Sequence, residues 1–225
     1  MTTTAEIISI GDELLYGQTL DTNAHWISHK LDEYNIKVFQ RTTIGDDVDQ
    51  ILNAFATAAE RVDIVLITGG LGPTKDDLTK PLLAKYFGVD MVHHEEVLRD
   101  ITLLFAKASR EVTALNAQQA DLPANCEKIT NPVGTAPGMW FYENNTVFVA
   151  MPGVPYEMKS IMTQGILPKL HEMFSKGVLH HHISKTIGIT ESSLSDLIED
   201  WEVNLPKHIK LAYLPTKGQV KLRMT

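Results

Sequence analysis

Hydrophobic positions in the first half of the chain follow two alternating patterns. Short β-branched runs are typical of buried strands, which we expect at 5–10, 36–43 and 62–68. Apolar residues spaced three or four apart predict amphipathic helices at 24–34, 48–59 and from about 78 to Phe87. Strands buried on both faces and separated by helices are typical of a parallel sheet, so this half predicts an α/β fold.

Local signals place the ends of these helices. The cluster Asp21-Thr22-Asn23 precedes the first helix, and Asp46-Asp47 precedes the second. Short polar side chains at these positions accept hydrogen bonds from the first free amides of a helix. Gly88 follows the third helix, where glycine favours a left-handed end.

The pattern continues with more irregular connections up to residue 173. Further helices are predicted at 95–107, 113–120 and 156–173, the last interrupted near Gly165 and Pro168. The segment Asn131–Gly138 is too rich in glycine and proline for regular structure. Two strands, 139–142 and 146–150, are expected to form a hairpin through Glu143-Asn144-Asn145.

From residue 174 the pattern changes to that of a small α+β unit. We expect a helix at 191–201, capped by Thr190, among strands at 180–187, 210–214 and 219–224. The apolar stripe of that helix is interpreted as core and consists of Leu194, Leu197, Ile198 and Trp201. The sequence thus predicts a three-layer α/β/α domain over residues 1–173 with a mostly parallel sheet. A second unit follows at 174–225, and we expect it to be incomplete because the sequence stops within its last strand.

Composition excludes several classes of protein. The chain has 225 residues, of which 44% are hydrophobic and 21% charged, as in a globular protein. No apolar run is long enough for a membrane span, and we expect neither a secretory signal nor a membrane partner. The single cysteine, Cys126, permits no intrachain disulfide, is interpreted as structural, and fits a cytoplasmic location. The net charge of −8 argues against a nucleic-acid partner, which needs a basic face.

Segments rich in glycine or carboxylates, which are candidates for ligand binding or catalysis, lie where predicted strands end. Gly11-Asp12-Glu13, Thr68–Asp77 and Met151–Pro155 each follow a strand directly. In open α/β sheets, ligands bind beyond the carboxyl ends of the strands, so we expect these segments to meet there. Asn131–Gly138 and Asp46-Asp47 are candidates to join them.

The segment Thr68–Asp77 is the strongest candidate. Its glycines allow the backbone to approach a phosphate, and the helix that follows favours an anion at its N-terminus. It matches neither the Walker loop nor the dinucleotide fingerprint. The alternative is an ordinary strand-to-helix turn in which Asp76 or Asp77 caps the helix.

Acidic pairs at the strand ends suggest a divalent cation. Carboxylates beside a phosphate repel it unless a hard cation lies between them. We favour this role for Asp12, Glu13, Asp76 and Asp77, whereas Asp46 and Asp47 are interpreted as helix caps. The run His180-His181-His182 is not expected to bind metal, because adjacent strand residues face opposite sides.

Together, the motifs resemble the N-terminal domain of the CinA family over residues 4–173. The resemblance rests on the order and spacing of Glu6–Leu15, Asp21-Thr22-Asn23, Thr68–Thr79, Asn131–Gly138 and Met151–Met158. It implies a molybdopterin-binding-like fold, as in MogA and MoaB proteins, followed by a KH-like unit. It also implies a metal-dependent ADP-ribose pyrophosphatase that releases AMP and ribose 5-phosphate, although the usual Nudix signature is absent. The nicotinamide-nucleotide deamidase domain of longer family members has no counterpart in these residues, so we expect no deamidase activity.

The resemblance, combined with the residue patterns, suggests roles for individual residues. Catalysis is assigned to Asp76, Asp77 and Glu13, and the cation to Asp12, Asp76 and Asp77. The phosphate and nucleotide are assigned to Gly69, Gly70, Gly72, Thr74, Asn131, Gly134, Thr135 and Gly153. The expected cofactor is Mg²⁺, Mn²⁺ or Co²⁺, with K⁺ as an optional addition. The expected partners are ADP-ribose or a related nucleotide and a second copy of the chain.

Two alternatives belong to other functional classes. One is a binding module that holds molybdopterin or a nucleotide without turnover. Leu71 and the Pro73-Thr74 insertion distinguish this chain from the shorter glycine loop of MogA-like proteins. The other is a competence-associated interaction protein. RNA binding by the KH-like unit is not expected, because its glycines Gly177, Gly188 and Gly218 do not form a Gly-x-x-Gly clamp.

Overall fold

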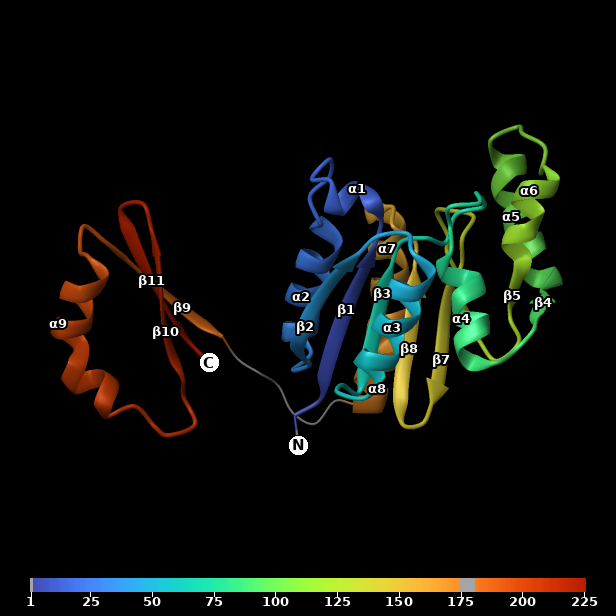
Figure 1. Cartoon of the computed structure of the whole chain (residues 1–225). Coiled ribbons are helices and arrows are strands. Elements are labelled where there is room, and N and C mark those ends of the chain that lie inside the picture. The colour runs from blue at the N-terminus through green and yellow to red at the C-terminus, as the bar shows by residue number, and fades with distance from the viewer. Residues whose placement is uncertain (1, 175–180) are drawn as a thin grey trace. The chain divides into compact units, whose positions relative to one another are not determined.

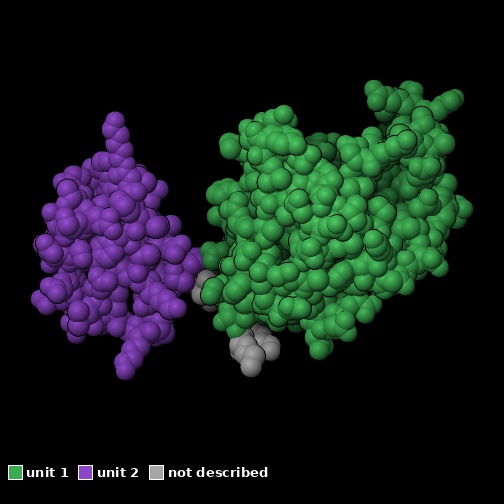
Figure 2. Space-filling view, viewed as in Figure 1, with its two compact units in different colours: residues 1–176 green, residues 177–225 purple. Residues whose placement is uncertain are grey.

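The chain forms two compact units in the computed structural model, which describes residues 2–174 and 181–225. The first unit spans 1–176 and the second 177–225, coloured green and purple in Figure 2. Within the described ranges, no helix is both long enough and apolar enough to cross a membrane.

A six-stranded sheet is the centre of the first unit (Figure 1). Its order is β2-β1-β3-β8-β7-β6, and the first four of these strands run parallel. The last two run antiparallel to their neighbours. The strands are β1 (Thr4–Ile10), β2 (Lys37–Ile44), β3 (Ile64–Thr68), β6 (Glu127–Ile129), β7 (Gly138–Glu143) and β8 (Thr146–Met151). The predicted α/β class with a mostly parallel sheet is confirmed.

Alternation along the central strands supplies two hydrophobic cores, one on each face of the sheet. In β3, Val65 and Ile67 belong to one core, whereas Ile64 and Leu66 belong to the other. All five residues of β3 are buried, so the strand has no polar face. This explains why its sequence is a continuous apolar run instead of an alternating one.

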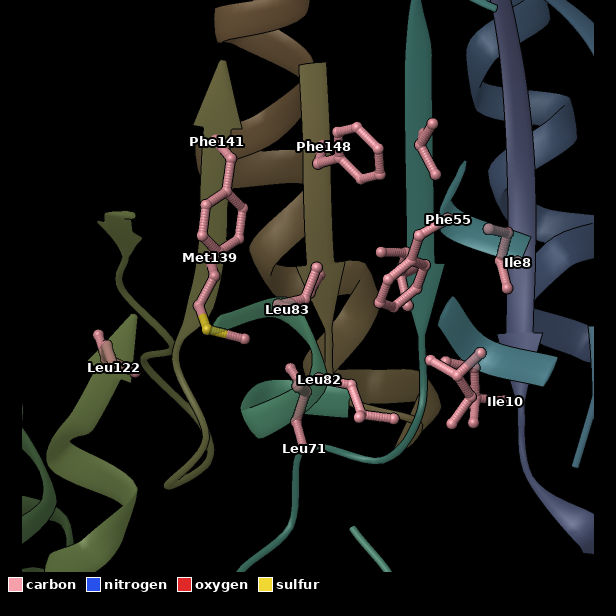
Figure 3. Close-up of a cluster of buried hydrophobic side chains, with 14 of the residues drawn as sticks. Ile8, Ile10, Phe55, Leu71, Leu82, Leu83, Leu122, Met139, Phe141 and Phe148 are labelled. Atoms are coloured by element: carbon pink, nitrogen blue, oxygen red, sulfur yellow. The ribbon is translucent and has the colours of Figure 1, made fainter. Parts of the chain in front are cut away.

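Helices cover both faces and complete three layers. The first core takes side chains from α3 (Val48–Ala59), α4 (Thr79–Phe87) and α5 (Glu95–Lys107). Figure 3 shows part of this core, with Phe55 of α3 and Leu82 and Leu83 of α4 beside Phe148 and Phe141 of the sheet. The second core takes side chains from α2 (Thr22–Glu33), α7 (Pro155–Ile161), η2 (Met162–Ile166) and α8 (Leu167–Phe174).

Several predicted boundaries are revised. The helix expected at 156–173 has no break in the chain of helical residues. At the predicted interruption it changes to a π-helical turn, η2, which contains Gly165. The hairpin turn is Asn144-Asn145, both with positive φ, which matches the twist of the strands it joins. The helix expected at 113–120 divides into α6 (Ala114–Ala117) and a 3₁₀ turn, η1 (Gln118–Ala120). The sequence patterns did not indicate α1 (Asp12–Leu15), β4 (Met91–His93), β5 (Asp121–Pro123) or β6.

The second unit is a three-stranded antiparallel sheet with one helix. The sheet order is β10-β11-β9, with β9 at His182–Ile187, β10 at Leu211–Thr216 and β11 at Gln219–Met224. The residue expected to begin the first strand, His180, lies outside the described residues. Pro215 belongs to β10 and not to the turn, which an edge strand tolerates because its free side needs no amide.

Helix α9 (Glu191–Val203) corrects the prediction about its apolar stripe. Thr190 caps it as expected, and Leu194 is buried against Val220 and Leu222. Leu197, however, is 73% exposed and Trp201 is 44% exposed. A core of three strands has room for only part of the stripe, so half of the residues interpreted as core face outward.

One ion pair holds the edge of the large sheet. Glu6, in β1, is completely buried and accepts two hydrogen bonds of 2.7 Å from Arg61. A third, of 2.6 Å, comes from the Thr42 hydroxyl of β2. A carboxylate without water needs such partners, because the desolvation of a charge is costly.

Replacing Arg61 by Met is expected to lower the free energy of unfolding by about 3 kcal/mol, because Glu6 would remain buried without its cation. Urea unfolding followed by circular dichroism measures the loss. The double variant Arg61→Met/Glu6→Leu should recover most of it. A double variant as unstable as the single one would contradict this account of the pair.

Candidate functional site

The carboxyl ends of β2, β1, β3 and β8 lie at one edge of the sheet, and β7 begins there. The loops that follow or precede these strands enclose a cleft of about 520 Å³. This size is usual for a small-molecule site. The cleft is lined by Ile10, Gly11, Glu13, Asp46, Gly69, Gly70, Leu71, Gly72, Pro73, Asp76, Asp77, Gln119, Thr135, Ala136, Pro152, Gly153, Val154 and Glu157. Five segments distant in sequence therefore meet as expected.

The glycine loop, residues 69–77, is closed internally by Asp77. One oxygen of this carboxylate accepts from the amide of Gly72 at 2.8 Å. The other oxygen accepts from the amide of Thr74 at 2.9 Å and from the Thr74 hydroxyl. The alternative that Asp76 or Asp77 caps the next helix is wrong, since α4 has Leu78 at its N-cap and no side-chain cap. Asp77 braces the loop instead.

The same loop is also anchored to the hydrophobic core. Leu71 is 2% exposed and packs in the core drawn in Figure 3. The buried Thr79 hydroxyl donates to the carbonyl of Gly69 at 2.8 Å, and the Thr79 amide donates to that of Gly70. Both glycines have positive φ, and a Cβ on Gly69 would lie 2.1 Å from the carbonyl oxygen of Ile10. Close packing, and not only approach to a ligand, thus requires glycine here.

Only some of the predicted phosphate contacts have free amides. The amide of Gly69 donates to Met151, and those of Gly72 and Thr74 donate to Asp77. Within the described part of the chain, no bond is formed by the amides of Gly70 and Leu71, both of which line the cleft. Thr74 does not line it. Of the four loop residues predicted to bind phosphate, only Gly70 therefore has a free amide that lines the cleft, and Leu71 supplies a second.

Asn23 ties two of the loops together beneath the cleft. Its side-chain amide donates to Thr68 at 3.0 Å and to the carbonyl of Gly153 at 2.7 Å. The Thr68 hydroxyl in turn donates to the carbonyl of Pro152. Asn23 was expected as part of a cap cluster and of a family motif, with no role of its own, and within that cluster Asp21 does cap α2. Its position 13 residues after the end of β1 gave no further signal.

Four carboxylates form an acidic cluster, Asp12, Glu13, Asp46 and Asp76, at one part of this edge. Asp46 and Asp12 interlock, because each backbone amide donates to the carboxylate of the other. Burial raises the pKa of Asp46, and the charges of Asp12, Glu13 and Asp76 raise it further. The interpretation of Asp46 as a helix cap is wrong, whereas Asp47 does cap α3.

The predicted cation ligands are not assembled as expected. In the part of the chain that the structure describes, no three Asp, Glu, His or Cys side chains form a metal-holding group. Asp77 is occupied by the loop amides, so the trio Asp12, Asp76 and Asp77 requires correction. Asp46 takes the place of Asp77 among the charges that interact with Asp12 and Asp76.

The Gly- and Pro-rich segment contributes one side of the cleft. Thr135 lines it, whereas Asn131 and Gly134 border a smaller hollow of about 10 Å³ beside Thr135. The side-chain amide of Asn131 donates to Glu157 at 2.7 Å and to the carbonyl of Ala136 at 2.8 Å. Asn131 thus holds the conformation of this segment through hydrogen bonds and does not line the cleft itself. Glu157, on α7, lines the cleft. It belongs to the motif Met151–Met158, but no role was predicted for it.

A buried pair, Lys80 and Gln119, was also missed. Lys80 is 8% exposed, and its ammonium donates to the Gln119 side-chain oxygen at 3.0 Å and to the Gln119 carbonyl. Burial lowers the pKa of Lys80 to about 8, partly offset by the charges of Asp121 and Asp77. A lysine in the first turn of a helix gives no sequence signal of burial. Burial also raises the pKa of the nearby Cys126 thiol to about 11, as suits a structural cysteine.

Comparison with protein families assigns both units. Residues 6–172 match the family described as "Probable molybdopterin binding domain", and residues 181–225 match the "Damage-inducible protein CinA KH domain". The chain belongs to the CinA family. The resemblance seen in the sequence motifs is confirmed, as is the small KH-type unit.

Individual relatives in the CinA family support this assignment. A CinA-like protein of Cytophaga hutchinsonii is 48% identical over 98% of this chain, and one of Flavobacterium psychrophilum is 46% identical over 98%. A Clostridium botulinum relative, named as a competence-damage inducible protein, is 38% identical. The chain spans about half the length of these relatives, 53% of the first two.

Solved structures support the fold of the first unit. The structure of a CinA protein from Thermoplasma acidophilum is 34% identical, with a TM-score of 0.67 over 77% of this chain and 98% of that one. A molybdopterin biosynthesis protein from Mycobacterium abscessus is 18% identical, with a TM-score of 0.52 over 77% of this chain and 95% of that one. The second likeness establishes only that this CinA chain shares the fold.

The Asp77 brace leads to a stability prediction that separates two adjacent carboxylates. Asp77→Asn should lower the free energy of unfolding by about 1–3 kcal/mol, because the new amide cannot accept from the Thr74 backbone. Asp76→Asn, at an exposed position, should cost less than half as much. Urea unfolding of both variants measures the difference. Equal losses would show that Asp77 does not brace the loop.

Proposed function

We propose that the first unit hydrolyses the pyrophosphate of ADP-ribose to AMP and ribose 5-phosphate. The proposal rests on a single observation: amides free to bind phosphate and a carboxylate cluster belong to the same cleft. Family membership, with its match to a molybdopterin-binding domain, is consistent with a phosphate-bearing ligand. A pyrophosphate needs both elements, since its charge must be neutralised and a water molecule must be activated.

Gly70 and Leu71 bind the pyrophosphate in this proposal. Their amides line the cleft and have no partner among the described residues. Because Asp77 and the burial of Leu71 hold the loop, these donors are already oriented before a ligand arrives. Preorganised donors stabilise developing charge without the cost of reorganisation.

The acidic cluster is suited to a divalent cation shared with the substrate. The pKa of Asp46 is raised mainly by burial and further by the charges of Asp12, Glu13 and Asp76, and a cation would relieve that repulsion. Mg²⁺ is commonly held by one or two carboxylates together with phosphate oxygens, so a complete protein cage is not required. We propose that one or two of Asp12, Asp46 and Asp76 would hold the cation together with the phosphates, whose charge it would neutralise.

Glu13 is the proposed acceptor of the proton from water. It lines the cleft, and its carboxylate forms no hydrogen bond within the described ranges. In the reaction, the water oxygen bonds to one phosphorus, and the bond from that phosphorus to the bridging oxygen breaks. The bridging oxygen leaves on the other phosphate, and Glu13 takes the proton.

A binding module without turnover is the second candidate. It is favoured by the Asp77 brace, because a carboxylate engaged by two amides is no longer free to act on a substrate. In this case the same cleft would hold molybdopterin or a nucleotide. The family description names molybdopterin, so it favours a pterin ligand.

The first experiment incubates the purified chain with ADP-ribose and Mg²⁺, Mn²⁺ or Co²⁺, and AMP is followed by chromatography. AMP release that depends on the cation and falls at least a hundredfold in Asp76→Asn and Glu13→Gln is expected. Asp196→Asn, an exposed carboxylate of α9, is the matched control and should retain the wild-type rate.

The outcomes distinguish the two candidates. No AMP with any cation, together with saturable binding of ADP-ribose or molybdopterin, would replace the hydrolase proposal by the binding module. Full activity in both variants would remove the acidic cluster from the mechanism.

A further inference from the structure

Gln119 lines the cleft and carries a buried side-chain donor that is unused among the described residues. Its side chain is 1% exposed, and the nitrogen Nε2 has no hydrogen-bond partner in the described parts of the chain. Buried side-chain donors are nearly always paired in folded proteins, so an orphan needs an explanation. A ligand in the cleft is the partner that the position of Gln119 permits.

Lys80 fixes which end of the Gln119 carboxamide is the donor. The ammonium of Lys80 has only hydrogens to offer, so the atom it meets at 3.0 Å must be the carboxamide oxygen. A second bond, to the Gln119 carbonyl at 3.3 Å, holds the two residues together. The carboxamide cannot rotate by half a turn without placing two donors against each other. Nε2 is therefore held as a donor for a third group.

The elements around Gln119 differ from those around the acidic cluster. Three members of that cluster follow β1 and β2, at one end of the sheet order, and Asp76 belongs to the glycine loop. Gln119 lies in η1, just before β5, which contacts α4 and is on the other side of the first unit from β2 in Figure 1. Apolar residues line the cleft with it, among them Leu71 and Ala136. An oriented carboxamide beside apolar surface is the chemistry that recognises the edge of a planar base.

We infer that Gln119, oriented by Lys80, is a specificity-determining residue that donates from Nε2 to an acceptor atom on the nucleobase of the ligand. This deepens the proposed function, because it assigns the base to the part of the cleft that lies away from the acidic cluster. Lys80 is a positioning residue that acts through Gln119 and does not touch the ligand.

Calorimetric binding of AMP tests the inference independently of turnover, because AMP is a product and is not cleaved. Gln119→Glu keeps an oxygen for Lys80 but replaces the donor by an anionic acceptor. We expect the Kd for AMP to rise at least tenfold, with little change in the thermal midpoint. Gln118→Glu, at the exposed neighbouring position, is the matched control and should stay within twofold of wild type.

Two further measurements separate recognition of the base from a general effect. The affinity for ribose 5-phosphate, which has no base, should be the same in Gln119→Glu and wild type. Lys80→Met should weaken AMP binding less than Gln119→Glu, because a freed carboxamide can still turn its donor toward the base. Lys80→Arg should restore part of the loss.

Three results would contradict the assignment of Gln119 to the nucleobase. Unchanged AMP affinity in Gln119→Glu, equal losses for AMP and ribose 5-phosphate, or a wild-type chain that binds no AMP would each overturn the inference. AMP binding that depends on Gln119 in a chain that never cleaves ADP-ribose would leave the inference standing and overturn the hydrolase proposal alone.

Discussion

The attachment of the glycine loop to the body of the first unit is the constraint on which the cleft depends. Leu71 lies in the hydrophobic core, and the Thr79 hydroxyl holds the carbonyl at the start of the loop. Asp77 closes the other end by accepting two backbone amides. A loop fixed at three points loses little conformational entropy when a ligand binds, so its two free amides are an efficient site for an anion.

The sheet supplies the remaining geometry. Four parallel strands end at the same edge, and this brings the acidic residues after β1 and β2 to the edge where the glycine loop begins. Asn23 adds a buried polar link between the ends of β3 and β8. The resulting site is held by backbone, side-chain and core contacts. Asp46, Asp77 and Glu157 take part in them, whereas the Glu13 carboxylate forms no hydrogen bond among the described residues.

The main helices and strands could be predicted from the sequence because their hydrophobic and capping patterns are strong. Continuous apolar runs such as β3 are typical of buried parallel strands, and Asp47 and Thr190 are capping residues at predicted helix starts. The segments that form the cleft could also be predicted, since loops after parallel strands must share an edge. The roles of single residues could not. Asp76 and Asp77 are adjacent and chemically identical, yet the amides of Gly72 and Thr74 donate to Asp77.

The other residues whose roles were predicted wrongly or missed share a physical cause. Tertiary packing, and not the local sequence, decides the environment of a side chain. Asp46 and Asp47 each suit a helix cap, but β2 delivers Asp46 to the acidic cluster. Lys80 lies in a helix pattern that gives no reason to expect burial, and Gln119 lies in a short irregular turn. In the second unit, the stripe of α9 exceeds what three strands can cover, so Leu197 remains exposed.

The most direct test of the central claim is a two-dimensional NMR titration of the labelled chain with ADP-ribose, with the backbone amides assigned. The account predicts that the amides of Gly70 and Leu71 show the largest shifts in the glycine loop. Those of Gly72 and Thr74, which already donate to Asp77, should shift less. Largest shifts in the second unit, or in the first unit away from the cleft, would contradict the claim that this edge of the sheet binds the ligand.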